Sequence, residues 1–145
     1  MFRAESVTAD GEDTTQARLT VFIAEDDKAA ATSLADLLVA QGGIEVVGVA
    51  NSEMTAADWL MNQQHATDVL ITDLLLLPGG SGFGIISHAR KLRAFRKVVV
   101  FSSFVTPAVS EKCIKLGTDA VFAKSELGQL LQYIGKQRAG GTCPK

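Results

Sequence analysis

Acidic residues stand directly after two short apolar runs of this chain. Glu25 and Asp26 follow the run at 19–24, and Asp73 follows the run at 68–72. Carboxylates that meet at one place repel one another unless a cation joins them. Mg²⁺ suits such a group because it takes oxygen ligands and binds one or two carboxylates together with a phosphate oxygen. These residues therefore indicate a magnesium site, provided that the two runs end side by side.

A hydroxyl and an ammonium group stand at the ends of two further apolar runs. Ser102 ends the run at 97–102, and Lys124 follows the run at 119–123. Directed hydrogen-bond donors and neutralising charge are what an incoming phosphoryl group requires. Either residue alone is typical of a turn or of a solvated surface, so the inference depends on their combination with the acids. Together they predict a site for a phosphoryl group.

Short β-branched apolar runs alternate along the chain with stretches of helical periodicity. This alternation is typical of βα units around a parallel sheet. In a doubly wound sheet, ligands bind beyond the carboxyl ends of the strands, which is where the acids, the hydroxyl and the lysine stand. The sequence thus predicts an α/β domain with a doubly wound parallel sheet. The expected strands cover residues 19–24, 45–50, 68–72, 97–102 and 119–123.

Residues that favour helix ends mark the expected helices. Asp27 is suited to cap one helix, and Thr106-Pro107 is suited to open another. Gly42 and Gly117 stand where two helices should stop. Apolar residues at helical spacing predict the buried faces of the first and last helices. The predicted stripes are Ala30, Leu34, Leu37, Leu38 and Gln41 in the first helix, and Leu127, Leu130, Leu131 and Ile134 in the last.

The chain has the length of one ordinary domain, at 145 residues. We expect residues 19–138 to form that domain, between a disordered N-terminal tail at 1–18 and a flexible C-terminal tail at 139–145. The net charge is −2, with acids and bases spread along the sequence. This distribution argues against a nucleic-acid-binding surface.

No apolar run approaches the roughly 20 residues that span a bilayer, and the N-terminus lacks the basic start and apolar stretch of a secretory peptide. A cytoplasmic location is therefore expected. Cys113 and Cys143 stand far apart, and we interpret them as free thiols in a reducing compartment. His65 and His88 are expected at the surface, and Trp59 is expected to be partly packed.

Four motifs carry a family resemblance. They are, in order, VFIAEDD, VLITDLLLLPGGSGFG, VVVFSS and AVFAKS. Together they resemble the receiver domain of two-component response regulators, over essentially everything between the tails. The resemblance implies a flavodoxin-like (βα)5 fold whose five-stranded sheet has the order 2-1-3-4-5. It also implies that Glu25 and Asp26 are the acidic pair, Asp73 the phosphoacceptor, Ser102 the switch hydroxyl and Lys124 the phosphate-contacting lysine.

The resemblance implies a reaction as well. A sensor histidine kinase or a phosphotransfer protein would present phosphohistidine, and an ionised Asp73 would accept the phosphoryl group, which water later removes. Mg²⁺ would be held by Glu25, Asp26 and Asp73, together with a backbone carbonyl after Asp73. Ser102 would then move toward the phosphoryl group and repack the last two helices and the strand between them. On this interpretation the chain catalyses only its own phosphorylation and dephosphorylation and is not otherwise an enzyme.

The implied partners are proteins. Only a short tail follows the expected last helix, so we expect a stand-alone receiver that acts through a downstream effector protein, with no direct nucleic acid and no membrane among its partners. A homodimer through the fourth helix, fifth strand and fifth helix stays open. Two other functions also stay open: a phosphorylation-independent interaction module, and a phosphatase that forms an aspartyl-phosphate intermediate. The phosphatase is disfavoured because Leu75 stands where such enzymes place a second acid.

The chain departs from the family pattern in two loops. Leu77 stands where the family has proline and Pro78 follows it, so the loop after Asp73 is expected to be one residue longer. The glycine-rich stretch at 79–84 is expected to be a flexible lead into the third helix. Ser125 replaces a second proline and is expected to cap the last helix.

Apolar residues occupy three further positions near the expected site. Val121, with Phe122 beside it, stands where the family often places a switch aromatic. Leu75 and Phe104 lie two residues after the acceptor and after the switch hydroxyl, at positions that flank the approach of water in the family. Apolar side chains there would shield the acyl phosphate, and we hypothesise a slow autodephosphorylation.

Overall fold

The computed structural model describes residues 18–62, 67–76, 80–93 and 95–142. Five strands form one parallel sheet in the order β2-β1-β3-β6-β7, and β4 and β5 form a separate antiparallel pair. Counted along the chain, the strands of the large sheet stand in the order 2-1-3-4-5, which confirms the predicted fold. The strands are β1 (Leu19–Ala24), β2 (Ile44–Ala50), β3 (Thr67–Thr72), β4 (Leu75–Leu76), β5 (Gly80–Ser81), β6 (Phe95–Ser102) and β7 (Ala120–Ala123).

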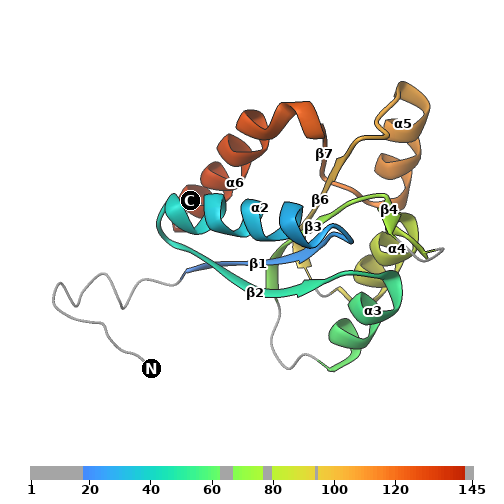
Figure 1. The fold of residues 1–145 in the computed structure, drawn as a ribbon, viewed down its shortest axis with the longest axis horizontal. Coiled ribbons are helices and arrows are strands. Elements are labelled where there is room, and N and C mark those ends of the chain that lie inside the picture. Colours follow the sequence, from blue (N-terminus) through green and yellow to red (C-terminus); the bar gives the residue numbers. More distant parts are fainter. Residues whose placement is uncertain (1–17, 63–66, 77–79, 94, 143–145) are drawn as a thin grey trace, which may run out of the picture.

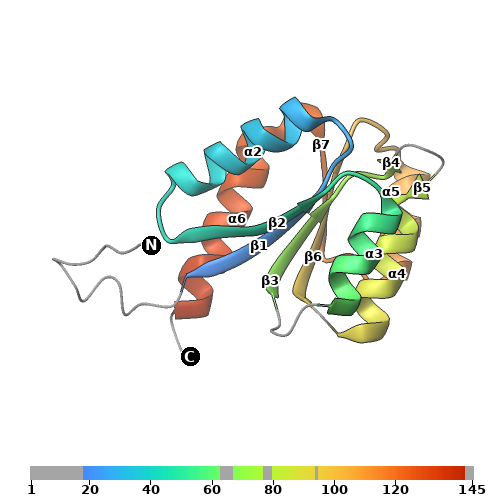
Figure 2. The same ribbon diagram turned by 60° about the horizontal axis from the view of Figure 1, so that its bottom comes forward.

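Helices cover both faces of the large sheet (Figure 1). Helices α2 and α6 lie on one face, and α3, α4 and α5 lie on the other, as Figure 2 shows most clearly. The helices are α2 (Lys28–Ala40), α3 (Glu53–Asn62), α4 (Gly82–Leu92), α5 (Pro107–Leu116) and α6 (Leu127–Thr142), with a 3-10 turn, η1 (Lys124–Glu126), before α6.

Alternating side chains of β1 supply both hydrophobic cores. Val21 and Ile23 belong to the core under α2 and α6, whereas Phe22 and Ala24 belong to the core under α3, α4 and α5. None of these four side chains is more than 1% exposed. Packing on both faces holds the central strands in place, and with them the residues at their carboxyl ends.

Predicted helix ends are found where the sequence placed them. The Asp27 side chain accepts a hydrogen bond from the Ala30 amide, and the Thr106 hydroxyl accepts one from the Val109 amide, both at 3.1 Å. Helix α5 ends at Leu116 and is capped by Gly117, whose φ of 108° lies in the left-handed region that favours glycine. These caps fix where α2 begins and where α5 begins and ends.

The buried stripe of α2 differs from the prediction at its edges. Ala31 rather than Ala30 begins the stripe, which continues through Leu34 and Leu38. Leu37 is 40% exposed. The predicted stripe was too wide, because residues at 31, 34 and 38 already follow the helical period and fill the space above the sheet.

The last helix begins and ends differently from the prediction. Ser125 lies exposed within η1, and the capping carboxylate comes from Glu126, which accepts from the Ala123 amide at 2.8 Å. At its other end α6 continues to Thr142, so its backbone includes part of the expected flexible tail at 139–145.

The loop after Asp73 forms a short hairpin that leads directly into a helix. Leu75 pairs with Ser81, and α4 begins at Gly82 with the Ser81 hydroxyl as its cap. Glycine is required at the helix start because a Cβ on Gly82 would lie 2.0 Å from the Asp73 carbonyl oxygen. The helix therefore begins within the stretch at 79–84, which the sequence predicted to be a lead into it.

Other predictions concern isolated side chains. Trp59 stacks on Phe22 with ring centroids 4.0 Å apart, which confirms its packing role. Cys113 is buried and His88 is exposed. In the described ranges, every helix is too short or too polar to cross a membrane. Predictions also fall on positions outside those ranges, namely 1–17, 143–145, His65, Leu77, Pro78 and Cys143.

Candidate functional site

Pairing between β1 and β2 continues one residue past the end of β1. The Glu25 amide donates to the Ala50 carbonyl at 2.9 Å, so Glu25 still lies against the sheet and is only 7% exposed. Two residues later Asp27 caps α2, and Asp26 stands between them, partly exposed. This short turn presents two adjacent acids at the carboxyl edge of the sheet.

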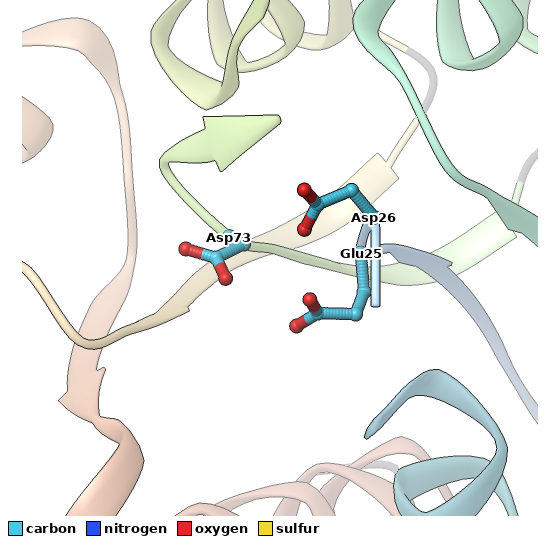
Figure 3. A group of neighbouring side chains, drawn as sticks. All are labelled: Glu25, Asp26 and Asp73. Atoms are coloured by element: carbon cyan, nitrogen blue, oxygen red, sulfur yellow. The ribbon is translucent and has the colours of Figure 1, made fainter. Parts of the chain in front are cut away.

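The neighbouring strand β3 brings Asp73 to the same place. The Asp73 amide donates to the Ala24 carbonyl at 3.0 Å, which extends the pairing of β1 and β3 up to the acids. Glu25, Asp26 and Asp73 each offer one carboxylate oxygen within 4.8 Å of the others. Figure 3 shows the three side chains gathered beyond the strand ends. The structure therefore brings together the acids that the sequence singled out.

The two carboxylate oxygens of Asp73 have different surroundings. Oδ1 accepts from the amides of Leu74, at 2.6 Å, and of Leu75, at 3.3 Å. Oδ2 lies 3.4 Å from the Lys124 ammonium nitrogen, and the Asp73 side chain is 12% exposed. The amides fix the orientation of the carboxylate and leave Oδ2 directed toward the cationic side of the site.

Lys124 follows β7 and lies against two of the acids. Its Nζ donates to Glu25 Oε1 at 2.7 Å and lies 5.3 Å from the centroid of the Phe101 ring. Burial alone would lower the pKa of Lys124, but the hydrogen bond to Glu25 and the charges of Glu25 and Asp73 outweigh burial and raise the pKa. The ammonium group therefore carries its charge at neutral pH.

Glu25 is buried, whereas the other two acids are partly exposed. Burial raises the pKa of Glu25, against the lowering effect of hydrogen bonds from Lys124 and from the Asp27 amide, which lies 3.1 Å from Oε2. The charge of Asp73 adds to the rise. Ionisation of Glu25 is therefore costly beside the other acids. Additional positive charge at the site would stabilise the ionised form of Glu25.

The donor set of these three acids fits Mg²⁺. Magnesium takes hard oxygen ligands at about 2.1 Å, so two ligands on opposite sides of the ion lie roughly 4.2 Å apart. The carboxylate oxygens, within 4.8 Å of one another, are close to that separation. Asp26 and Asp73 are the more accessible of the three acids.

Ser102 ends β6, one strand away from Asp73 and beside the strand that leads to Lys124. It pairs with Ala123 in the β6–β7 ladder and is fully buried. Its hydroxyl accepts from the Phe104 amide at 3.2 Å and, in the part of the chain described, forms no hydrogen bond with Asp73 or Lys124. The structure thus places Ser102 at the predicted edge, with its hydroxyl engaged by the loop that follows.

The neighbouring strand β7 carries Val121 and Phe122 on opposite faces. Val121 packs against the core under α3, α4 and α5. Phe122 packs on the other face, and its ring centroid lies 5.7 Å from that of Tyr133 on α6. The aromatic ring next to the predicted switch position is therefore part of the packing of α6.

An apolar groove lies beside the acids. Leu74, Leu75, Phe83, Phe104 and Val109 line a hollow of about 190 Å³. Leu75 is 48% exposed and Phe104 is 57% exposed. The two positions that were expected to flank the approach of water therefore line one groove, which begins at the residue after Asp73.

Glu53 is a residue of this edge that the sequence interpretation missed. It begins α3, and its Oε1 accepts from the Ser81 amide at 2.9 Å. Glu53 therefore joins α3 to the β4–β5 hairpin. A signal was present in the sequence, because an acid also follows the predicted strand at 45–50, at the same edge of the sheet as the other acids.

Comparison with known proteins shows which family this chain resembles. The family model described as the response regulator receiver domain matches residues 21–135. The transcriptional regulatory protein DesR of Bacillus subtilis (strain 168) is 27% identical over 106 residues, which cover 73% of this chain and 51% of DesR. The chain thus spans about half the length of this curated relative.

Solved structures show the same fold. A DNA-binding response regulator of the LuxR family from Staphylococcus aureus matches with a TM-score of 0.72 and 23% identity, covering 83% of this chain and 98% of that one. A two-component response regulator of the LuxR family from Aurantimonas sp. SI85-9A1 matches with a TM-score of 0.75 and 22% identity, covering 86% and 87%. Because the family model also spans most of the sequence, the chain belongs to the response regulator receiver domain family.

Proposed function

We propose that this receiver domain is a phosphoacceptor signalling protein in which Asp73 takes a phosphoryl group from a histidine kinase or a phosphotransfer protein. The observation that carries the proposal is the unequal environment of the Asp73 carboxylate. Oδ1 is held by two backbone amides, while Oδ2 lies 3.4 Å from Lys124 Nζ. The hydrogen bonds to Oδ1 orient the carboxylate. Oδ2 faces the Lys124 ammonium group, whose charge would stabilise an incoming phosphoryl group.

The proposed transfer is a single displacement at phosphorus. A lone pair of Asp73 Oδ2 forms a bond to phosphorus as the phosphorus–nitrogen bond of phosphohistidine breaks. The electrons of that bond leave with the imidazole nitrogen, and an acyl phosphate remains on Asp73. Lys124 offsets the charge of the phosphoryl oxygens, while the amides of Leu74 and Leu75 hold the acceptor. Water later cleaves the acyl phosphate, which restores the carboxylate and releases inorganic phosphate.

Glu25, Asp26 and Asp73 would hold Mg²⁺, which supplies positive charge to the phosphoryl oxygens when it is bound. Crowded carboxylates would repel an anionic phosphodonor, and the positive charge of the ion would offset that repulsion. Asp26 and Asp73 reach the solvent and can ligate directly. Glu25 is more deeply buried. One of its carboxylate oxygens accepts from Lys124, and the other accepts from the Asp27 amide.

The proposed signal leaves the site through Ser102. Its hydroxyl accepts from the Phe104 amide, so its own proton is left to donate to a phosphoryl oxygen. A shift of Ser102 would move the loop that contains Phe104 and leads into α5. A downstream effector protein that docks on α5, β7 and α6 would then distinguish the two states.

Incubation with Mg²⁺ and acetyl phosphate, followed by measurement of the intact mass, tests the proposal. The wild-type protein should gain one phosphoryl group, and Asp73→Asn should gain none. Asp27→Asn is the matched control, because it removes an acid from the same edge while asparagine still caps α2. This variant should gain the phosphoryl group as the wild type does.

Several results would count against the proposal. Folded wild-type protein that gains no mass with Mg²⁺ would overturn it, and so would an adduct that persists in Asp73→Asn. Continuous phosphate release from a generic phosphoester that depends on Asp73 would instead favour a phosphatase. We propose that the chain is not such an enzyme, because Leu75 stands where a second acid is required.

A further inference from the structure

We propose that Glu53 is a positioning residue of the phosphoryl site, which anchors the β4–β5 hairpin and thereby fixes the Asp73 carboxylate. The inference rests on the proposed role of Asp73 and extends it to a residue on a different helix. Glu53 acts on the backbone that follows Asp73 by two routes. The first is a series of hydrogen bonds through the hairpin, and the second is close packing against the first turn of α4.

The first route joins the two carboxylates through the hairpin. Glu53 Oε1 accepts from the Ser81 amide at 2.9 Å. Ser81 pairs with Leu75 across the hairpin. The Leu75 amide in turn donates to Asp73 Oδ1 at 3.3 Å. A shift of Ser81 would therefore move one of the two amides that orient the acceptor.

The second route runs through the first turn of α4. A Cβ on Gly84 would lie 2.0 Å from Glu53 Oε2, so glycine at this position leaves room for the carboxylate. The carboxylate thus lies against the N-terminus of α4, where the helix dipole favours a negative charge. The adjacent Gly82 touches the site itself, since its amide donates to the Leu74 carbonyl at 3.1 Å and a Cβ on it would lie 2.0 Å from the Asp73 carbonyl oxygen.

The hairpin needs such an anchor because it is very short. Each of its strands has two residues, Leu75–Leu76 and Gly80–Ser81. Even longer isolated two-stranded hairpins are marginally stable in water. Loss of the Glu53 contact should allow the hairpin to open for part of the time, which would release Asp73 Oδ1 from its amides. Weaker Mg²⁺ binding and slower phosphorylation would follow.

Three single variants test the first route. Glu53→Ala should speed amide hydrogen exchange of Ser81 and Gly82 in the metal-free protein by about tenfold, because it removes a hydrogen bond to a charged acceptor. The same variant should raise the Kd for Mg²⁺ by about tenfold, a typical effect of losing a group that supports metal ligands. Glu53→Gln keeps an acceptor oxygen and should fall between. The matched control is Asp58→Ala, which removes an exposed acid from the same helix and should leave exchange and Kd unchanged.

Gly84→Ala tests the second route without touching Glu53. The added Cβ would displace the Glu53 carboxylate, so this variant should also speed exchange and weaken Mg²⁺ binding. In the Glu53→Ala background the space is free, and Gly84→Ala should cause no further loss. Alanine has a higher helix propensity than glycine, so a loss in the single variant cannot be ascribed to a weaker helix.

The outcomes separate this proposal from the proposed function. Wild-type exchange rates and Mg²⁺ affinity in Glu53→Ala would overturn the role of Glu53, even if Asp73 is phosphorylated normally. Additive effects of Gly84→Ala and Glu53→Ala would overturn it as well. If the wild-type protein is never phosphorylated, the proposed function fails, while the exchange and Mg²⁺ measurements still decide whether Glu53 positions the acids.

Discussion

The two ends of the parallel sheet both carry charged residues, but they pair them differently. At the amino ends of the strands, Asp68 accepts from a backbone amide of β1 at 2.9 Å and lies 3.5 Å from Arg96 Nε. Asp119 accepts from the Val98 amide at 2.8 Å and forms an ion pair with Arg90. Each of these acids has a backbone donor and an arginine of its own.

At the carboxyl ends, three acids gather within 4.8 Å, and Lys124 pairs with two of them, Glu25 and Asp73. The two acids named at the amino edge each have an arginine partner, whereas one lysine at the carboxyl edge lies against two crowded acids. We expect the pairs at the amino edge to stabilise the fold. Carboxylates crowded at the carboxyl edge repel one another, and a bound cation would offset that repulsion. The crowding, rather than the mere presence of acids, marks the end of the sheet where ligands are expected.

The largest effect on stability is expected at the amino edge. Asp119→Ala should lower the free energy of unfolding by about 2 kcal/mol, because the Val98 amide and the Arg90 guanidinium lose their acceptor. Urea denaturation measures this change. Phosphorylation by acetyl phosphate should stay normal in the folded protein, and an unchanged unfolding midpoint would show that the amino edge does not stabilise the fold as proposed.

Magnesium should stabilise the protein through the other edge. With Mg²⁺ at ten times its Kd, the wild-type protein should gain about 1.4 kcal/mol in the free energy of unfolding. Asp26→Asn should lose most of this gain, because it removes an accessible ligand. Asp68→Asn removes an acid from the opposite edge and should keep the full gain, whatever its stability without Mg²⁺. Equal gains in both variants would contradict the placement of the metal.

The lifetime of the phosphoryl group should depend on the apolar groove beside Asp73. Leu75→Asn should shorten this lifetime by about fivefold, which corresponds to roughly 1 kcal/mol in the barrier, because a polar side chain would admit water. Release of inorganic phosphate from the purified phosphoprotein gives the rate. Leu92→Asn, an exposed leucine at the far end of α4, serves as the control. A wild-type lifetime of only seconds would be evidence against shielding.

A smaller effect concerns Tyr133, the single tyrosine of the chain. Burial raises the pKa of Tyr133, and the charge of Asp119 adds to the rise. The pKa of Tyr133 in the folded protein lies above the unfolded value of 10.0. The contribution of the neutral phenol to the free energy of unfolding is therefore fully present below pH 10.0, and it is lost as the pH rises through the folded pKa. Asp119→Asn should lower the pKa slightly, as seen by absorbance titration of the phenolate. An upward shift would contradict the contribution of Asp119.

The sheet and its acids were predictable from the sequence because both depend on local patterns. The apolar runs before Glu25, Asp73, Ser102 and Lys124 predict central strands, and strands of a parallel sheet end at a common edge. Glu53 follows the same rule but was overlooked, since an acid at the first position of a helix also has an ordinary explanation as a partner of the helix dipole.

The remaining details depend on tertiary contacts. The hairpin after Asp73 could not be predicted, because its strands are two residues long and its stability depends on Glu53 and on the packing of Gly82. Likewise, the hydrogen-bonding propensity of Ser125 predicts a cap, but Glu126 reaches the open amide of Ala123 instead. Such choices are decided by which side chain the folded backbone brings within reach.

The central claim is that Asp73 accepts a phosphoryl group at the carboxyl edge of the sheet. Borohydride reduction of the acetyl phosphate-treated protein, followed by peptide mass mapping, tests it most directly, because hydride converts an aspartyl phosphate to homoserine. We expect homoserine at position 73 in the presence of Mg²⁺ and none when Mg²⁺ is chelated. Homoserine at another acid, or conversion of Asp73 that is independent of Mg²⁺, would contradict the claim.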